Sequence, residues 1–175
     1  MPIKTIFLDR DGVINKEINY LYKIKDFEFI SGIFDTCIHF RKLGYKIIII
    51  TNQSGISRGL YTESDYQNLT QWMLKKFNKN NVEILDVFHC PHGPESNCYC
   101  RKPMPGMLLK AKDKYNIDMM KSWMIGDKDA DIVSANKSGI SNTILVRSGH
   151  AINQSTSNAK FILDSIRDSK KIIVI

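Results

Sequence analysis

The feature that most constrains the fold is an uninterrupted run of four isoleucines at residues 47–50. A strand that is apolar at every position has to be covered on both faces, which is typical of a parallel strand inside a sheet. Segments with strand and helix patterns alternate along the chain, and this order favours parallel strands joined by right-handed helical crossovers. We therefore predict an α/β fold, a Rossmann-like parallel sheet with helices on both faces.

The other elements follow from short apolar runs and from apolar residues at helical spacing. Strands are predicted at residues 4–8, 46–50, 84–89, 122–125 and 143–146, and a short strand and a helix within 161–175. Helices are predicted at residues 62–77, 107–115 and 130–138, and around Phe34, Cys37, Ile38 and Leu43, with a stop at Gly44. Thr62 is a candidate N-cap, although Glu63 comes too early for a capping box.

Length and composition fit a single folded domain over residues 1–175, large enough to bury a core. No apolar run approaches the roughly 20 residues that span a bilayer, and the first four residues lack the apolar stretch of a secretory signal. We expect a cytoplasmic monomer that does not bind membranes. The formal net charge of +7 is spread along the chain, which is typical of a solvated basic surface and indicates an acidic ligand only weakly.

Two acids follow the first predicted strand, in the stretch Asp9-Arg10-Asp11-Gly12. Ligands bind at the carboxyl ends of strands in open α/β sheets, so these carboxylates would lie where a substrate sits. One carboxylate can attack phosphorus while the other manages the proton of the leaving oxygen. The same tetrapeptide also fits an acidic turn, because Asp and Gly are common turn residues.

Three further polar stretches follow later strands. Residues 51–55 (Thr-Asn-Gln-Ser-Gly) supply a hydroxyl and backbone N–H groups that can hold phosphate oxygens. Lys102 can neutralise charge on a transferring phosphoryl group, and residues 126–131 (Gly-Asp-Lys-Asp-Ala-Asp) offer the oxygen ligands that suit magnesium. Each stretch alone also fits a polar loop, a surface lysine or an acidic helix start, but parallel strands would bring all of them to one sheet edge.

Three of the four cysteines gather near a histidine, and Cys90, His92, Cys98 and Cys100 place four soft ligands within eleven residues. Three thiolates and an imidazole complete a tetrahedral zinc with no open position, which is typical of a structural site. Free thiols or a transient disulfide are the alternative. His89 is a competing ligand that we expect to be packed at the strand end. The zinc-binding loop would lead directly into the segment that carries the predicted lysine.

Together the stretches read Asp-x-Asp, Thr, Lys and Gly-Asp, and in this order the chain resembles the haloacid dehalogenase-like phosphatases over nearly its whole length. The resemblance implies that Asp9 attacks phosphorus and becomes an aspartyl phosphate. It implies that Asp11 protonates the leaving alcohol and later takes a proton from the hydrolytic water. It also implies a magnesium ion held by the side chains of Asp9 and Asp127 and by the backbone carbonyl of Asp11.

The same resemblance assigns the remaining catalytic groups. Thr51 and the amide of Asn52 would bind the phosphoryl oxygens, and Lys102 would stabilise the charge on the transferring group. Asp131 would orient Lys102 or a metal-bound water. Two anions, a carboxylate and a phosphate, repel one another, so a divalent ion and a lysine are the charges that this reaction needs.

The zinc loop extends the resemblance to the D-glycero-D-manno-heptose 1,7-bisphosphate phosphatases, through the motifs DRDGVIN, TNQSGI, CRKPxPGM and GDK. These enzymes remove the 7-phosphate during synthesis of heptose for lipopolysaccharide or surface polysaccharide. Histidinol-phosphate phosphatases share nearly all of these motifs and are the alternative. The cations Arg58, Arg101 and Lys128 favour a substrate with a second phosphate. The chain departs from the pattern at Val13, where many relatives carry threonine.

The resemblance also implies a set of substrate contacts in the loops around the predicted nucleophile. They are Glu17, Ile18, Asn19, Tyr20, Thr51, Asn52, Gln53, Ser54, Arg58, Arg101, Lys102 and Lys128. The connection from Gly12 to Ser31 and the zinc loop are too short for a second domain, so we expect no large cap and an open site for a small phosphorylated sugar. A zinc-containing nucleic-acid-binding module is a remote alternative, because the cluster lacks the long spacing and recognition helix of a C₂H₂ finger.

Overall fold

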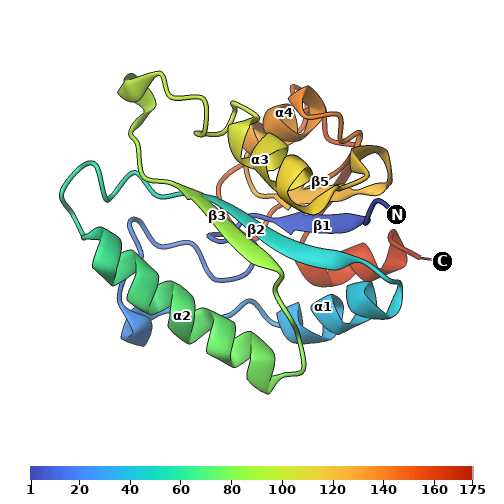
Figure 1. Cartoon of the computed structure of the whole chain (residues 1–175), viewed down its shortest axis with the longest axis horizontal. Coiled ribbons are helices and arrows are strands. Elements are labelled where there is room, and N and C mark those ends of the chain that lie inside the picture. Colours follow the sequence, from blue (N-terminus) through green and yellow to red (C-terminus); the bar gives the residue numbers. More distant parts are fainter. Residues whose placement is uncertain (175) are drawn as a thin grey trace.

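A computed structural model describes residues 1–174 and contains one parallel sheet in the strand order β3-β2-β1-β4-β5-β6 (Figure 1). The strands are β1 (Thr5–Leu8), β2 (Lys46–Asn52), β3 (Asp86–Cys90), β4 (Trp123–Gly126), β5 (Asn142–Val146) and β6 (Phe161–Leu163). Every pair of neighbouring strands is parallel. The predicted α/β class is confirmed, and the first strand of the chain occupies the interior of the sheet.

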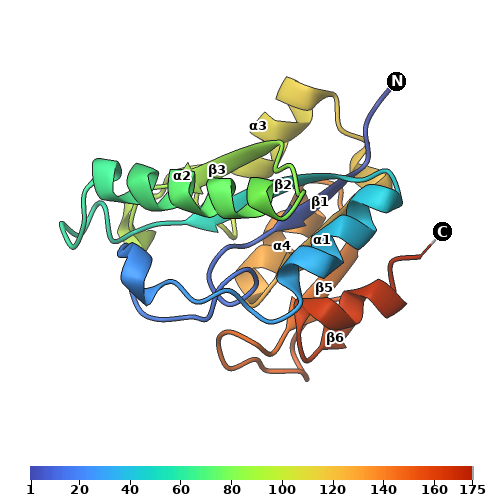
Figure 2. The ribbon, with the colours of Figure 1, turned by 90° about the horizontal axis from the view of Figure 1, so that it is seen from below.

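Helices cover both faces of the sheet, as the alternation of elements predicted (Figure 2). The α-helices are α1 (Ile33–Lys42), α2 (Glu63–Lys79), α3 (Gly106–Tyr115) and α4 (Asp129–Lys137). Short 3₁₀ helices occupy Ile24–Asp26, Pro94–Ser96, Met119–Lys121 and Ile166–Lys171. Residues of α1, α2 and the last 3₁₀ helix share one core cluster, whereas those of α3 and α4 share the other.

The two core clusters follow from the alternation of side chains along each strand. On β1, Ile6 and Leu8 belong to the α1 and α2 side, and Phe7 belongs to the α3 and α4 side. The isoleucines of β2 divide in the same way, with Ile47 and Ile49 on the first side and their neighbours on the second. All four isoleucines are at most 1% exposed, so both faces of this strand are buried, as predicted.

One local feature differs from the sequence-based expectation, and a second makes it more specific. Thr62 does cap α2, but it also forms a capping box, because Asp65 rather than a glutamate accepts from its backbone N–H. The shorter aspartate reaches the same position, so the expected absence of a box was wrong. Residues 161–171 form β6 and then a 3₁₀ helix with a Ser165–Asp168 capping box, where a short strand and a helix of unspecified type were predicted.

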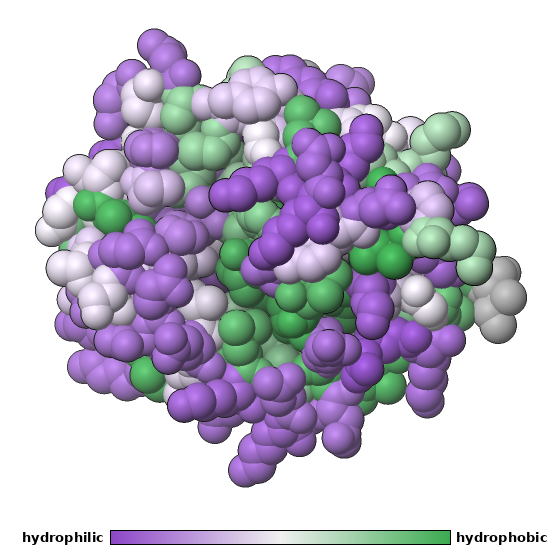
Figure 3. Space-filling model, viewed as in Figure 1, coloured by the Kyte–Doolittle hydropathy of each residue, from purple (hydrophilic) through white to green (hydrophobic). Residues whose placement is uncertain are grey.

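The described residues contain one sheet, and the connection between Gly12 and Ser31 holds only a short 3₁₀ helix and isolated bridges. This connection therefore holds no cap domain. Among the helices in this range, none is both long and apolar enough to cross a membrane. The surface seen in Figure 3 is mainly hydrophilic, with an apolar area near the edge strand β3.

Candidate active site

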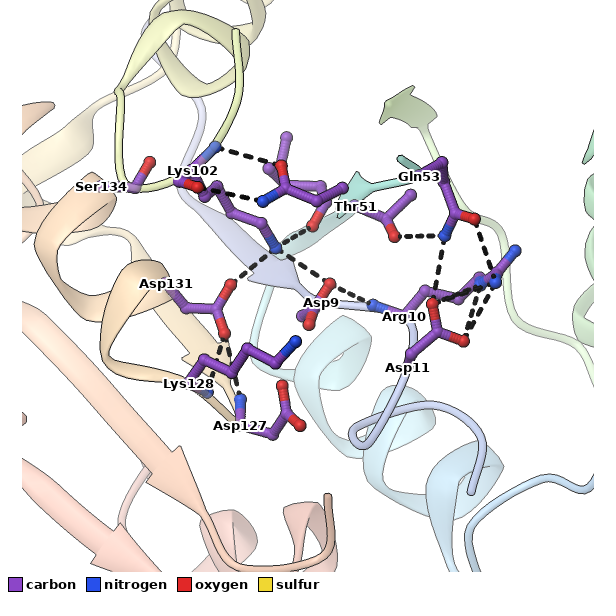
Figure 4. A network of polar contacts seen from close by, with 12 residues as sticks. Asp9, Arg10, Asp11, Thr51, Gln53, Lys102, Asp127, Lys128, Asp131 and Ser134 are labelled. Atoms are coloured by element: carbon purple, nitrogen blue, oxygen red, sulfur yellow. Dashed lines mark hydrogen bonds and ion pairs between the residues drawn. The ribbon is translucent and has the colours of Figure 1, made fainter. Parts of the chain in front are cut away.

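The carboxyl ends of the central strands bring the predicted site residues together (Figure 4). Asp9 directly follows β1, and its backbone N–H donates to the carbonyl of Ile125 on β4 at 3.0 Å. Thr51 lies at the end of β2, and Asp127 follows β4. Lys102 arrives from the long connection after β3. The parallel arrangement thus places side chains from distant parts of the chain at one edge, as predicted.

Lys102 is the electrostatic centre of the site. Its ammonium lies 2.9 Å from Asp9 Oδ1 and 2.6 Å from Asp131 Oδ1, and it donates to the Ile50 carbonyl at 2.7 Å. The side chain is only 3% exposed. Burial disfavours the charged amine, but the two carboxylates outweigh it and raise the pKa of Lys102 above its ordinary value. The lysine therefore stays charged inside the protein.

The backbone of Lys102 is held as firmly as its side chain. Asn52 donates from Nδ2 to the Lys102 carbonyl at 3.0 Å and accepts from the Lys102 N–H at 3.1 Å. The end of β2 therefore fixes the segment that delivers the lysine. Asp131, at the start of α4, accepts from the backbone N–H groups of Asp127 and Lys128 through its other oxygen, which fixes the carboxylate that pairs with the lysine.

Three buried acids, Asp9, Asp127 and Asp131, form a cluster whose oxygens lie within 4.8 Å of one another and could hold a metal ion. Burial raises the pKa of Asp9 well above its ordinary value, and the two other acids raise it further, against the opposing effect of Lys102. A cation near Asp9 would favour its ionised form. Asp127 Oδ1 is buried and has no hydrogen-bond partner. Asp131 is already occupied, so Asp9 and Asp127 are the side chains that fit a magnesium ion.

The carboxylate of Asp11 lies apart from this acidic cluster. It accepts from Arg10 Nη2 at 3.0 Å, from Asn15 Nδ2 at 3.0 Å and from Gln53 Nε2 at 3.1 Å. Arg10 is 1% exposed and its guanidinium also donates to the carbonyl of Leu21. Only the backbone carbonyl of Asp11 was expected to bind magnesium, and the position of its side chain does not conflict with that expectation.

A polar cavity of about 290 Å³ opens in front of these groups. Its lining includes eleven of the twelve expected substrate contacts, namely Glu17, Ile18, Asn19, Tyr20, Asn52, Gln53, Ser54, Arg58, Arg101, Lys102 and Lys128. The twelfth, Thr51, is 1% exposed. Arg58 lies over the ring of Tyr20 at 5.9 Å, and in Figure 4 the side chain of Lys128 extends toward the acidic cluster. Eleven of the expected contact residues therefore surround one cavity.

His150 is a site residue that the sequence reasoning missed. Its Nδ1 lies 2.6 Å from Asp127 Oδ2, its backbone N–H donates to the same oxygen at 2.9 Å, and its Nε2 is 3.8 Å from Glu17 Oε1. A Cβ on the neighbouring Gly149, or on Gly12, would collide with the Asp127 carboxylate. The loop after β5 therefore packs closely on Asp127. A lone histidine in a polar loop carries no spacing signal that could have revealed this contact.

The four soft ligands also converge. Cys100 Sγ lies 3.0 Å from Cys90 Sγ and 3.5 Å from Cys98 Sγ, and His92 Nδ1 lies 3.3 Å from Cys100 Sγ. All four cysteines of the chain are free thiols. The cluster could hold a metal ion, and its donor set suits zinc. His89 is outside the cluster, because it pairs with Glu63 at 2.9 Å.

Comparison with known proteins agrees with this architecture. A family model described as HAD-hydrolase-like matches residues 99–169. The chain is 51% identical over 164 residues to a D-glycero-alpha-D-manno-heptose-1,7-bisphosphate 7-phosphatase of Photorhabdus laumondii, covering 90% of each chain. It is 40% identical to the D-glycero-beta-D-manno-heptose-1,7-bisphosphate 7-phosphatase of Escherichia coli, over 98% of this chain and 94% of that protein.

A solved structure shows the same fold. The D,D-heptose 1,7-bisphosphate phosphatase of B. bronchiseptica, complexed with magnesium and phosphate, superposes with a TM-score of 0.84 at 25% identity, covering 97% of each chain. The sheet, the buried acids and the lysine at its edge define a phosphate-ester hydrolase, and the chain belongs to the HAD-like hydrolase family. Within that family its relatives at 38–51% identity are heptose-1,7-bisphosphate 7-phosphatases.

Proposed function

We propose that this protein is a magnesium-dependent phosphatase that removes the 7-phosphate of D-glycero-D-manno-heptose 1,7-bisphosphate for heptose precursor synthesis. The observation that carries the proposal is the convergence of Asp9, Lys102 and Asp127 at one sheet edge, in a chain 51% identical to a phosphatase of that name. The continuous six-stranded sheet supports a single functional domain. Four free thiols support a reducing compartment such as the cytoplasm.

The α anomer of the sugar is the preferred candidate substrate. The relatives from Photorhabdus laumondii and Campylobacter jejuni, at 51% and 50% identity, are named for the α anomer. Relatives at 38–45% identity from Vibrio cholerae, Yersinia pestis and Escherichia coli are named for the β anomer. A second phosphate on the sugar would find positive charge at the cavity wall, where Arg58, Arg101 and Lys128 lie.

In the proposed reaction Asp9 attacks phosphorus and forms an aspartyl phosphate, while Asp11 gives a proton to the leaving sugar oxygen. Asp11 then takes a proton from water as the aspartyl phosphate is hydrolysed. Thr51 and the amide of Asn52 bind the phosphoryl oxygens. Lys102, held by its two ion pairs, stabilises the negative charge on the transferring group.

A bound magnesium ion would neutralise charge on the phosphoryl group and on the nucleophile. Asp9 and Asp127 would hold it with the backbone carbonyl of Asp11, and the unpartnered Asp127 Oδ1 supports this assignment. The pairing of Asp131 with the lysine supports an orienting role for that acid. A structural zinc at the four soft ligands would fix the loop that runs into Lys102.

The deciding experiment measures phosphate release with magnesium from both anomers of the heptose bisphosphate and from histidinol phosphate. We expect the highest kcat/KM for the α anomer, with heptose 1-phosphate as the product, and no turnover by Asp9→Asn. A preference for histidinol phosphate would overturn the substrate assignment. Equal turnover by Asp9→Asn and the wild type would overturn the nucleophile.

A further inference from the structure

Other protein groups use every hydrogen-bond donor and acceptor of the Gln53 side-chain amide. Its Oε1 accepts from the Tyr61 hydroxyl at 2.5 Å and from Arg10 Nη2 at 3.4 Å. Its Nε2 donates to Thr51 Oγ1 at 2.8 Å and to Asp11 Oδ2 at 3.1 Å. An amide offers two donors and one oxygen acceptor with two lone pairs, so no capacity remains for a ligand. Gln53 lines the cavity, but its side chain serves its neighbours rather than a bound sugar.

The partners of this amide fix its orientation. Arg10 can only donate, so the Gln53 atom that faces the guanidinium has to be the oxygen. The amide nitrogen then points to Thr51 and Asp11, since a carboxylate accepts. The Tyr61 hydroxyl has to donate, because the atom it meets is the amide oxygen. These contacts form a hydrogen-bond chain with one direction, from the phenol through the amide to two groups of the active site.

The direction of this chain determines what the Thr51 hydroxyl can do. Thr51 Oγ1 accepts from the amide, so its own proton is left to donate elsewhere. A phosphoryl oxygen is an acceptor, and a hydroxyl that donates is what binds it. If the amide were flipped, Gln53 Oε1 would face Thr51. The Thr51 hydroxyl would then donate its proton to Gln53 and would have only lone pairs to present to an anion.

The fold holds Tyr61 in a single place. Tyr61 is 5% exposed, and its ring stacks on that of Tyr22, with centroids 5.3 Å apart and planes at 17°. Gly55 leaves the space for it, because a Cβ there would overlap the Tyr61 ring. Burial raises the pKa of Tyr61 to about 12. The phenol therefore keeps its proton throughout the range in which the protein would work.

We propose that Gln53 and Tyr61 are positioning residues that set the hydrogen-bond direction at Thr51 and anchor the Asp11 carboxylate. One amide would thus link the group that binds the phosphoryl oxygens to the group that transfers the proton. This inference rests on the roles of Thr51 and Asp11 in the proposed function. It goes beyond the expected substrate contact of Gln53 and gives a role to Tyr61, which no sequence motif indicated.

Two variants test this series of hydrogen bonds, one at the Tyr61 phenol and one at the Gln53 amide. Tyr61→Phe removes one donor and keeps the ring. Gln53→Glu is nearly isosteric but replaces the amide nitrogen with an acceptor, so the Thr51 hydroxyl would turn toward it and away from phosphate. The control is Tyr22→Phe, which removes a hydroxyl from the ring stacked on Tyr61 and leaves the amide untouched.

We expect Tyr61→Phe to lower kcat/KM for the sugar bisphosphate about 3–10-fold, the value of one hydrogen bond. The loss should be smaller with para-nitrophenyl phosphate, because a leaving group that is stable as an anion needs little help from an acid. Gln53→Glu should weaken inhibition by inorganic phosphate at least about 10-fold. A merely structural role would lower activity on both esters by the same factor.

The inference is wrong if Tyr61→Phe matches Tyr22→Phe on both esters, or if Gln53→Glu binds inorganic phosphate as tightly as the wild type. Circular dichroism of each variant distinguishes a folding defect from a loss of activity in a folded protein. Tyr61→Phe keeps the aromatic ring, so it still tests the inference if Gln53→Glu does not fold. A wild type that binds phosphate but hydrolyses no ester would instead sink the proposed function. The phosphate affinity of the Gln53→Glu variant would still test the inference in that case.

Discussion

Replacing Lys102 with methionine would expose the energetic role of the buried ion pairs. Methionine retains an unbranched apolar chain but leaves Asp9 and Asp131 facing each other without the cation that lies 2.9 and 2.6 Å from them. The Asp131 side chain is 2% exposed and that of Asp9 is 11% exposed, so water cannot replace the lysine effectively. Removing one partner of a buried pair costs about 3–5 kcal/mol, and we expect the free energy of unfolding near pH 8 to fall by that amount.

The loss should depend on pH in a defined direction. Burial already raises the pKa of Asp9 in the wild type, where Lys102 opposes the rise, so without Lys102 this pKa would rise further. The folded variant would then hold a proton on the acidic cluster at a higher pH than the folded wild type, whereas the unfolded chain, with an ordinary Asp pKa of 3.8, releases it. The unfolded variant then binds fewer protons than the folded one, so its stability rises as pH falls from about 8 to about 5. The difference from the wild type therefore shrinks over this range. The double change Lys102→Met with Asp131→Asn should recover part of the loss, because it removes one of the two carboxylates.

Denaturant unfolding, followed by circular dichroism at both pH values, measures these differences. The matched control is Lys114→Met, since Lys114 is 54% exposed and pairs with Asp86 at 2.8 Å. An exposed pair contributes about 0.2–1 kcal/mol, so this control should be nearly as stable as the wild type. If Lys102→Met is no less stable than Lys114→Met near pH 8, or if the double variant is the least stable of all, the electrostatic reasoning fails.

Three other predictions concern the metals and the cavity. Cys100→Ser should lose the stoichiometric zinc that we expect in the purified wild type and should melt at a lower temperature, and zinc analysis that finds the metal retained would contradict this. Burial raises the pKa of Glu17 from 4.5 to about 7, so the stability of the wild type falls as pH rises between these values. Without magnesium, Glu17→Gln should be about 1–2 kcal/mol more stable than the wild type near pH 8, allowing for solvent screening, and as stable as the wild type near pH 4. The same stability difference at both pH values would refute this prediction. His150→Ala should weaken magnesium binding about 10–100-fold in calorimetric titrations by releasing Asp127, and an unchanged affinity would exclude that role.

Much of the sheet and of the site edge could be predicted because both depend on local signals. A run of four isoleucines favours a strand that is buried on both faces inside a sheet, and parallel strands bring their carboxyl ends to one side. That rule was enough to place Asp9, Thr51 and Asp127 near one another. Lys102 was predicted at this edge only in the company of the other polar stretches, because it follows a long connection with no periodic pattern.

Other contacts could not be predicted, because they depend on loop paths and on rotamers. His150 reaches Asp127 through a loop whose course no periodicity encodes. The donor direction at Gln53 depends on the buried Arg10, which the sequence shows only as a charge between two acids. The capping box at Thr62 depended on whether Asp65 turns back to the helix start. These are choices among side-chain conformations that tertiary packing decides.

The central position of β1 has a consequence for how the protein gains activity. Asp9, the proposed nucleophile, follows β1 between β2 and β4, and the residues of its charge cluster come from segments on opposite sides of β1 in the sheet, up to 122 positions from Asp9 in the chain (131 − 9). No fragment that contains one half of the strands can assemble the full set of charges. During refolding, phosphate release should consequently appear only after the two halves have joined, which makes turnover a late and stringent reporter of native structure.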